Sequence, residues 1–450
     1  MGADSEETIM FRAGVSRRKF LQWSGAGFGA AALAACVPAP GAPAAGSGAD
    51  AEPVVIRFHG RTGVQGDHFI ERARAFEEEN PGITIKEELF PHAEYHQKME
   101  VLLAGQTIGD TFWTVLLSGL YHRYANQGVL LALDDLIASH EYDLGVFFPE
   151  SLDAASHAGS LYSLPWICHP GRVGCYYNKQ LLADNGLEEP PADGDWTFED
   201  LLEYATVLTQ DTDGDGQIDQ FGMQPGRDPW SLLVWSRGSG GEIFDEEGKT
   251  SLLDSEETLS AIRFVYDLMH THNVAPSPDQ QTADMFVSGR IGMAQSGYWG
   301  QSWVNRIGDR FELGAVPMPK GPAGINGSMY EFDPACIWAG SEHPDEAFEW
   351  VKWLANQETG IRIAEAGSVP GSRPDVWEHE RLTKSPIHNV FTNIMYNVLP
   401  YRGPGNFRGL EFRDAYSNGM DPIWLGNEEP ENLVPELSAK IQEILDKPAS

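Results

Sequence analysis

The pattern of apolar and polar positions at the start of the main body predicts a strand, a helix and a second strand. Residues 54–58 form a short β-rich run, and the next segment has the apolar spacing of one helical face, at Phe69, Ile70, Ala73 and Phe76. An Asn-Pro-Gly sequence at 80–82 ends this helix, and residues 83–89 alternate between apolar and polar side chains. A βαβ unit implies parallel strands joined by a right-handed crossover.

A further helix and strand extend this unit and indicate where a ligand would bind. We expect a helix over about 93–104 and a third strand over 110–115. In open parallel sheets, ligands lie beyond the carboxyl ends of the strands. The segments 59–63 and 110–113 are therefore places to look for a site, and they contain the polar candidates His59 and Asp110.

Length and composition point to a large, folded, acidic protein. The chain has 450 residues, 42% of them hydrophobic, so global disorder is excluded and more than one compact lobe is expected. Lys and Arg number 31 against 66 Asp and Glu, a formal net charge of −35. This acidic excess would repel phosphate backbones, so we expect no nucleic acid partner.

Residues 1–36 have the pattern of a targeting segment and not of a part of the fold. Residues 16–21, Ser-Arg-Arg-Lys-Phe-Leu, precede a Gly/Ala-rich apolar run that ends in Leu-Ala-Ala-Cys at Cys36. The arginine pair resembles a twin-arginine export signal, and the Cys36 sequence resembles a bacterial lipobox. The alternative is a buried N-terminal helix with a chance Arg-Arg pair.

These two resemblances imply an exported lipoprotein. Residues 1–35 would be the export signal, and 36–51 would be a lipidated Cys36 followed by a flexible Pro/Gly/Ala tether. No second run of about 18 apolar residues follows, so the chain itself should form no pore. The expected location is the outer face of the cytoplasmic membrane or the periplasm, held by an N-terminal lipid.

No motif for catalysis is present. The sequence lacks GxSxG, HExxH and GxxxxGK[ST], so we predict no catalytic residues, no catalytic cofactor and no enzyme activity. Beyond Cys36, the cysteines are Cys168, Cys175 and Cys336. A bridge between Cys168 and Cys175 and buried free thiols both remain open.

One acidic loop has the spacing of a calcium site. Counted from Asp211, carboxylates stand at loop positions 1, 3, 5 and 9, with Gly216 at position 6, where a sharp turn needs glycine. Hard oxygen donors in this alternation favour Ca²⁺. Position 12 is Gly222 instead of the bidentate Glu of an EF-hand. We predict a structural Ca²⁺ and keep a plain acidic turn as the alternative; the predicted ligands are Asp211, Asp213, Asp215, Gln217 and Asp219.

Several ordered motifs resemble those of a known transport family. Residues 161–166 and 174–182, Leu-Tyr-Ser-Leu-Pro-Trp and Gly-Cys-Tyr-Tyr-Asn-Lys-Gln-Leu-Leu, are similar to the LPW…YYNKxLL stretch of maltose-binding-type extracellular solute-binding proteins, family 1, which feed ABC importers. Further elements resemble that family in the same order along the chain: residues 196–201, 211–222, 286–299, 316–319, 346–354 and 367–370.

The resemblance implies an α/β, two-lobed, periplasmic-binding-protein-like fold (type II), each lobe a mainly parallel sheet flanked by helices. The N-terminal lobe would take 52–166 plus 335–368 and the C-terminal lobe 170–332 plus 372–450, with crossings near 166–175, 331–335 and 367–372. The family closes around its ligand, because a ligand that contacts both lobes favours the closed state.

A sugar ligand should leave a trace in the aromatic residues, because apolar sugar faces stack on indole rings while the hydroxyl groups need polar partners. Trp299 is the leading candidate, because its position in the family motif commonly supplies a stacking residue. The other aromatic candidates are Tyr298, Trp166, Trp338, Trp113 and Trp230, with Trp235 also considered. The polar candidates are His59, Asp110, Glu331, Asp333 and Arg373. Trp350 and Trp353, on an amphipathic helix, should belong to the core.

The leading interpretation is a monomeric lipoprotein that captures a carbohydrate, an oligosaccharide, and delivers it to the permease subunits of an ABC importer. The sequence departs from the family at Glu331-Phe332-Asp333, where small residues are usual, so a cationic or amino-bearing ligand such as a polyamine stays open. The runner-up is an exported carbohydrate-active hydrolase, which needs two carboxyl groups about 5–9.5 Å apart in one cleft. No motif selects such a pair.

Overall fold

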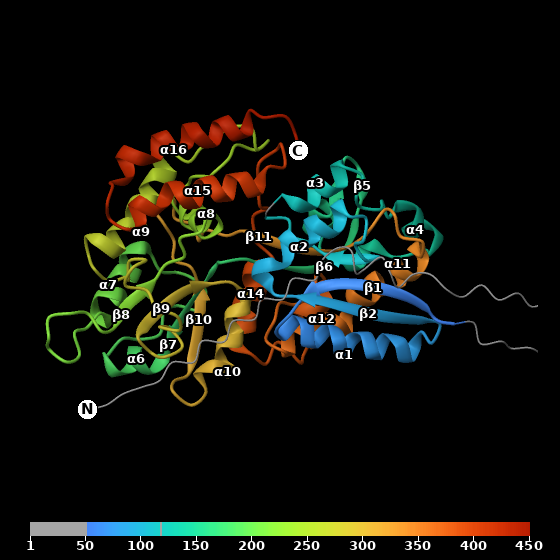
Figure 1. Cartoon of the computed structure of the whole chain (residues 1–450). Helices are drawn as coiled ribbons and strands as arrows, with labels where there is room; N and C mark the ends of the chain where they lie inside the picture. Colours follow the sequence, from blue (N-terminus) through green and yellow to red (C-terminus); the bar gives the residue numbers. More distant parts are fainter. Residues whose placement is uncertain (1–51, 118) are drawn as a thin grey trace, which may run out of the picture. The chain divides into compact units, whose positions relative to one another are not determined.

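The computed structural model describes residues 52–117 and 119–450 (Figure 1). The predicted export signal, the tether and the lipidation site Cys36 lie outside these residues. Within them, no helix is long and apolar enough to cross a membrane.

The structure confirms the predicted strand, helix and strand at the start of the body. β1 (Val54–Arg61) leads through α1 (Val64–Glu79) to β2 (Ile83–Phe90), and β1 and β2 are parallel along their full length. Figure 1 shows α1 running alongside these two strands. The predicted third strand is shorter than expected, β3 (Thr111–Trp113), and it lies parallel to the other side of β1.

The first sheet contains five strands in the order β2-β1-β3-β11-β6. Its last two members, β6 (Ser163–Pro170) and β11 (Tyr330–Ile337), are antiparallel to each other and buried along their whole length. β11 is also antiparallel to β3, with Ile337 opposite Thr111 and Ala335 opposite Trp113. The carboxyl ends of β1 and β3 therefore lie at the same edge of the sheet as the first residues of β11.

The second sheet is built from four strands in the order β10-β7-β9-β8, at β10 (Leu313–Pro317), β7 (Gly174–Asn178), β9 (Ile291–Ser296) and β8 (Phe221–Gln224). The chain passes from the first sheet to the second through residues 171–173, between β6 and β7. It returns through the segment between β10 and β11. Both connections meet at one place, because Tyr330 pairs with Pro170 and Gly171 donates a backbone hydrogen bond to the Met329 carbonyl at 2.9 Å.

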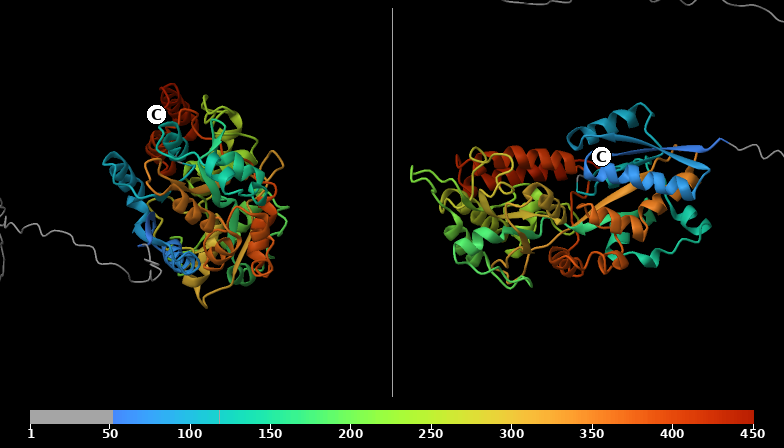
Figure 2. Two further views of the ribbon diagram at one scale, coloured as in Figure 1. Left: turned by 90° about the vertical axis from the view of Figure 1, so that its right-hand side faces the viewer. Right: turned by 90° about the horizontal axis from the view of Figure 1, so that it is seen from below.

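Helices surround both sheets (Figure 2), and Figure 1 shows α15 (Gly409–Trp424) and α16 (Pro430–Leu445) side by side. The remaining α-helices of the described residues are α2 (His92–Ala104), α3 (Leu120–Asn126), α4 (Asp134–Ser139), α5 (Pro149–Ala154), α6 (Lys179–Asp184), α7 (Phe198–Leu208), α8 (Pro229–Gly238), α9 (Glu256–His270), α10 (Trp303–Ile307), α11 (Pro344–Leu354), α12 (Gln357–Glu365), α13 (Pro374–Trp377) and α14 (Pro386–Met395). Two 3₁₀ helices, η2 (Leu144–Val146) and η3 (Tyr298–Ser302), and two short paired strands, β4 (Ser156–His157) and β5 (Ser160–Leu161), complete the described elements.

Local sequence signals explain where helices begin. At the start of α7, the Thr197 hydroxyl accepts a hydrogen bond from the Asp200 backbone N–H at 3.2 Å, and the Asp200 carboxylate accepts one from the Thr197 N–H at 2.7 Å. This capping box satisfies two helix-end donors that would otherwise lack partners. It begins α7 within residues 196–201, one of the segments that resemble the family.

The core of the first lobe contains the predicted tryptophan. Trp350 on α11 is fully buried, and its ring meets Phe58 of β1 at 5.7 Å and Phe76 of α1 at 5.4 Å. Burying such a side chain stabilises the fold by roughly 1.5–3 kcal/mol. Trp353, one turn further on, is half-buried and donates its indole N–H to the Arg72 carbonyl at 3.1 Å.

The three cysteines of the described chain are buried free thiols, Cys168, Cys175 and Cys336. Cys168 and Cys175 are therefore not bridged. Burial raises the pKa of each thiol well above its ordinary value, which keeps the groups neutral and unreactive.

Candidate functional site

At the edge where β1 and β3 end, an arginine covers a tryptophan. Arg61 is the last residue of β1, and its guanidinium carbon lies 3.7 Å from the ring centroid of Trp113, the last residue of β3. The Arg61 Nη2 atom lies 3.4 Å from Oδ2 of Asp333 on β11. Trp113 is buried behind this pair and stacks on His96 of α2 at 5.2 Å. The first lobe thus contributes a paired cation above an indole.

A second arginine occupies the crossing between the lobes. Arg172, in the connection from β6 to β7, pairs with Glu331 of β11, and its Nε atom lies 2.9 Å from Oδ1 of Asp228. The guanidinium carbon of Arg172 lies 5.2 Å from the ring centroid of Trp230 and 5.4 Å from that of Trp299. Two half-buried indole rings of the second lobe therefore face one cation that is held by carboxylates.

The backbone around Arg172 is shaped for this contact. Arg172 has φ 57°, in the left-handed region that costs a non-glycine residue energy unless the surroundings hold it there. Its carbonyl accepts a hydrogen bond from the Gln295 side chain of β9 at 2.9 Å. Glycine at the preceding position leaves room for the Glu331 side chain, which a Cβ at residue 171 would displace. Arg172 is thus held in place from several sides.

Asp228 connects this cluster to the start of α8. Its carboxylate accepts hydrogen bonds from the backbone N–H groups of Trp230 and Ser231 at 3.1 and 3.2 Å and from the Ser231 hydroxyl at 2.6 Å. A carboxylate at a helix N-terminus satisfies free donors and is favoured by the helix dipole. The same side chain therefore begins α8, positions Trp230 and binds Arg172.

Burial sets the charge state of the two β11 carboxyl groups. Desolvation raises the pKa of Glu331 to about 7, although Arg172 opposes the shift. Desolvation also raises the pKa of Asp333, against the attraction of Arg61. Nearby, burial lowers the pKa of His169 to about 3, so the ring that meets Trp299 edge-on at 5.5 Å is neutral.

Tyr401 connects the tryptophans of this cluster to the first lobe. The Trp230 indole N–H donates to the Tyr401 hydroxyl at 3.3 Å, and the hydroxyl donates to the Leu117 carbonyl at 3.2 Å. Leu117 follows β3 in the first lobe, whereas Trp230 begins α8 beside the second sheet. The hydroxyl group thereby joins the two lobes at the edge of the cluster.

The opposite face of β11 borders a cavity of about 540 Å³. Successive side chains of a strand point to opposite faces, so Tyr330 and Phe332 point away from Glu331 and Asp333. Tyr330 lines the cavity, and Phe332 meets Tyr121 of α3 at 5.9 Å. Both lobes contribute to the lining, which includes His122, Glu150, Asp153, Glu247, Tyr401 and Phe407. A smaller cavity of about 390 Å³, lined by Val173, Ser328 and Asn393 among others, lies beside the crossing.

The structure brings five of the predicted residues into one cluster: Trp113, Trp230, Trp299, Glu331 and Asp333. The other predicted residues lie elsewhere. Tyr298 is buried in the second lobe, where its hydroxyl bonds to Nδ1 of His388 at 2.6 Å. Trp166 is buried between Phe58 and Phe69 in the first lobe.

The remaining polar candidates make local structural contacts. Asp110 and Trp338 meet at the far edge of the first sheet, where the Trp338 N–H donates to the Asp110 carbonyl at 2.9 Å. His59 is fully buried and accepts the Gly109 N–H at 2.6 Å, and burial lowers its pKa to about 4. Arg373 pairs with Asp375 at 2.7 Å.

The cluster also contains Arg61, Arg172, Asp228 and Tyr401, which sequence patterns did not single out. Arg172 stands 159 positions from Glu331 along the chain, and Arg61 stands 272 positions from Asp333. One sequence signal could have pointed to these arginines, because each follows a glycine near the end of a strand. A ligand or another backbone segment often comes close at such a place.

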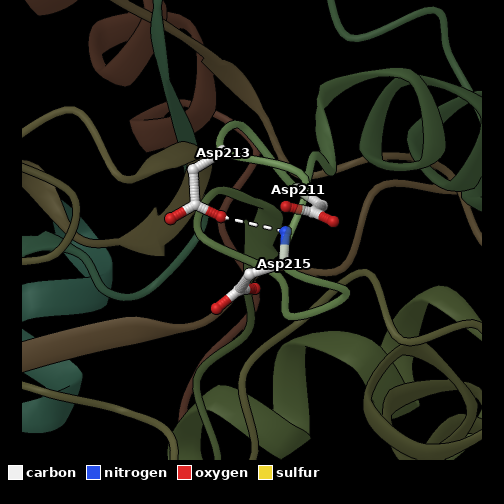
Figure 3. Close-up of side chains that lie close together, drawn as sticks. All are labelled: Asp211, Asp213 and Asp215. Carbon is white, nitrogen blue, oxygen red and sulfur yellow. Dashed lines mark hydrogen bonds between the residues drawn. The ribbon is translucent and has the colours of Figure 1, made fainter.

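The acidic loop brings three of its predicted ligands together. One ligand oxygen from each of Asp211, Asp213 and Asp215 lies within 4.8 Å of the others, on an exposed loop (Figure 3). Asp211 accepts the backbone N–H groups of Gly214 and Gly216 at 2.7 and 2.8 Å, which folds the loop around its carboxylate. These oxygen donors fit a hard cation such as Ca²⁺.

The other two predicted ligands of the loop make different contacts. The Asp219 carboxylate accepts the Thr212 N–H and hydroxyl at 2.9 and 2.7 Å, and the Gln217 side chain donates to Asp215 at 3.1 Å. No other group of three metal-ligating side chains occurs in the described part of the chain.

Comparisons with known proteins agree with this architecture. A sequence model of the family described as bacterial extracellular solute-binding protein matches residues 63–361. A binding protein of Brucella abortus is 25% identical over 421 residues, which cover 89% of this chain and 95% of that protein.

Two solved structures have the same fold. An ABC substrate-binding protein of Listeria monocytogenes in complex with cycloalternan has a TM-score of 0.78 and 18% identity, covering 88% of this chain and 99% of that one. The GacH receptor of Streptomyces glaucescens, solved unliganded and with acarbose, has a TM-score of 0.76 and 22% identity, with the same coverage of both chains. The likeness confirms the predicted two-lobed α/β periplasmic-binding-protein fold. The expectation of a mainly parallel sheet in each lobe is wrong, because β3, β11 and β6 pair antiparallel in the first sheet and β7 is antiparallel to both β10 and β9 in the second.

Proposed function

The chain belongs to the bacterial extracellular solute-binding protein family, and from that membership we propose that it captures a carbohydrate, an oligosaccharide, between its lobes and delivers it to an ABC importer. Members of this family are exported proteins that bind a solute and present it to a permease. The relatives described above include receptors solved with cycloalternan and with acarbose.

The observation that carries the sugar proposal is the pair of indoles around the crossing. Trp230 and Trp299 both lie within 5.5 Å of the Arg172 guanidinium, measured to their ring centroids. Each is half-buried, so part of its surface remains available to a ligand. Apolar sugar faces stack on such rings, while Arg172, Glu331 and Asp228 offer charged donors and acceptors to hydroxyl groups.

Intrinsic tryptophan fluorescence tests this proposal. The purified protein is titrated with a panel of neutral oligosaccharides, and a saturable change in emission is expected because Trp230 and Trp299 would contact the sugar. No saturable change with any sugar, together with saturable binding of a polyamine such as spermidine, would contradict the carbohydrate proposal.

A hydrolase would give a different result in the same samples. Continued release of reducing ends by catalytic amounts of protein would overturn the proposal of a binding protein. Stoichiometric binding with no released reducing ends supports it. The family consists of binding proteins. At the crossing between the lobes, Glu331 and Asp333 are each paired with an arginine, so they do not form the two free carboxyl groups that a hydrolase needs.

We also propose that the loop around Asp211, Asp213 and Asp215 binds a structural Ca²⁺. It would stabilise the connection between α7 and β8 and take no part in sugar binding. Calorimetric titration of the chelator-treated protein with Ca²⁺ should give a saturable heat of binding. The Asp213→Asn variant should give no such heat. Glu203→Gln removes one exposed charge from α7 and should leave this heat unchanged. Absence of Ca²⁺ heat in the unmodified protein would overturn the proposal.

Finally, we propose lipid anchoring at Cys36 after export through the twin-arginine signal. Cys36→Ser should move the exported protein from the membrane fraction to the soluble extracytoplasmic fraction, and Arg17→Lys with Arg18→Lys should retain it in the cytoplasm. A Cys36→Ser protein that still sediments with membranes would contradict the anchor.

A further inference from the structure

The charged groups at the crossing are paired among themselves. Arg61 faces Asp333, and Arg172 faces Glu331 and Asp228. The four side chains Arg61, Asp333, Arg172 and Glu331 are between 9% and 18% exposed, whereas Asp228 is 39% exposed. Charges this far from water are stable only when their partners stay in place.

The fifth charged group, the Asp228 carboxylate, is also stabilised by its surroundings. Two guanidinium groups face three carboxyl groups. Glu331, with a pKa of about 7, is only partly ionised at pH 7, and the surplus negative charge is assigned to Asp228. Asp228 caps α8, where it accepts three hydrogen bonds from Trp230 and Ser231 at the positive end of the helix dipole. The cluster therefore presents neither a free cation nor a free carboxylate to a ligand.

One of these pairs also lies against the aromatic surfaces that a sugar would use. Arg172 faces the two half-buried rings of Trp230 and Trp299, whereas Arg61 covers the buried ring of Trp113. A ligand on these rings must lie beside the paired groups. An ionised ligand group there would repel one member of a pair and draw the other away from its partner, whereas a hydroxyl group can bond to both.

We propose that Arg172, together with Glu331 and Asp228, determines ligand charge, so that the cleft accepts an uncharged polyhydroxy ligand and rejects its uronate and amino-sugar analogues. This inference rests on the proposed carbohydrate function and goes further by assigning the discrimination to named residues. Arg172 acts as a specificity-determining residue, because it neutralises one carboxylate from each lobe.

The test compares a neutral, an anionic and a cationic form of each of four sugar scaffolds. Probes are glucose, glucuronate and glucosamine, with the matching mannose and galactose trios and the disaccharides cellobiose, cellobiouronate and chitosan disaccharide, all measured by calorimetry at pH 7. For every scaffold that binds, the neutral member should bind roughly tenfold more tightly than either charged member.

Two substitutions should change this preference in opposite directions. Arg172→Gln leaves Glu331 and Asp228 without their cation, so the amino sugar should gain roughly fivefold or more relative to the neutral sugar. Glu331→Gln leaves Arg172 with one carboxylate fewer, so the uronate should gain instead. Arg172→Lys keeps the charge and should keep the neutral preference, as should the distant control Arg263→Gln on α9, whose partners are Glu429 and Glu431.

Each outcome distinguishes between explanations. Charged and neutral probes that bind equally to the unmodified protein would overturn the inference and leave the sugar proposal intact. The inference also fails if Arg172→Gln and Glu331→Gln weaken the binding of all probes equally, as a merely structural role would. If no neutral sugar binds, the proposed function fails and this inference fails with it. If Arg172→Gln does not fold, Glu331→Gln alone still decides the question through the uronate.

Discussion

The two faces of β11 offer contrasting environments between the lobes. On one face, Glu331 and Asp333 pair with arginines that lie against tryptophan rings. On the other face, Tyr330 borders a cavity of about 540 Å³, and the buried Tyr330 hydroxyl has no hydrogen-bond partner in the described part of the chain. Because successive side chains of a strand point to opposite sides, the charged and aromatic side chains lie on one face of β11 and the cavity lies on the other. The proposed ligand site therefore rests on side-chain chemistry and not on the size of a cavity.

We call the side of β11 that carries Glu331 and Asp333 the charged face and the side that carries Tyr330 the cavity face. Substitutions on the charged face should lower stability and ligand affinity much more than substitutions on the cavity face. Arg172→Met removes the cation that compensates buried Glu331, so we expect a loss of about 3–5 kcal/mol in the free energy of unfolding at pH 8. Urea unfolding measures this loss. The loss should be smaller at pH 5, where Glu331 is protonated. The double variant Arg172→Met, Glu331→Gln should recover much of it, and an equal loss in the single and double variants would contradict the assigned pairing.

The second prediction concerns the pH dependence of the charged face. Burial raises the pKa of Glu331 from 4.5 to about 7, so the folded protein holds a proton that the unfolded chain releases between these values. The stability from this group is fully present below about pH 4.5 and is lost as the pH rises through about 7.

The expected size of this loss is on the order of 3 kcal/mol for the pKa shift involved. The unfolding free energy of the unmodified protein minus that of Glu331→Gln should fall over this window and be flat above it. The titratable groups near Glu331 include Arg172, Asp333, Asp228, Arg61 and Tyr401, and none of these residues is substituted in the variant. A difference that is constant from pH 4.5 to 8 would refute the shift.

The third prediction separates the faces by ligand affinity. Trp299→Ala removes a stacking surface of the charged face and should weaken binding of a neutral oligosaccharide by roughly 1–3 kcal/mol. Calorimetric titration checks this, with Trp353→Phe on α11 as a matched aromatic control away from the crossing. Unchanged affinity in Trp299→Ala would remove Trp299 from the site.

The smallest effect is expected on the cavity face. Tyr330→Phe deletes a buried hydroxyl without a partner in the described residues, so stability should change by less than about 1 kcal/mol, or rise slightly. Sugar affinity should stay the same. Thermal unfolding and the same titration measure both quantities, and a large loss of affinity would place the ligand in the cavity.

The sequence predicted the framework because periodicity and caps are local signals. The β1–α1–β2 unit, the start of α7 and the buried Trp350 could all be predicted from patterns within about 15 residues. β3 is shorter than predicted because its regular pairing covers only Thr111–Trp113. Beyond it, the Thr114 N–H still donates to the Pro334 carbonyl of β11 at 3.0 Å, where the register of β11 is irregular.

The site was only partly predictable, for a physical reason. Tyr298 and Trp299 are neighbours in one motif, yet the 3₁₀ turn η3 directs Tyr298 into the core and Trp299 towards Arg172. The partners of Arg61 and Arg172 come from β11, hundreds of positions away in the case of Arg61. Such pairs depend on the tertiary fold, and no local spacing encodes them.

The most direct measurement is a crystal structure of the protein with a neutral oligosaccharide that saturates the fluorescence change. We predict sugar density against Trp230 and Trp299 on the Glu331 side of β11, with Arg172 still paired to Glu331 and Asp228. Sugar density in the cavity beside Tyr330, with the Arg172 cluster untouched by the ligand, would contradict it.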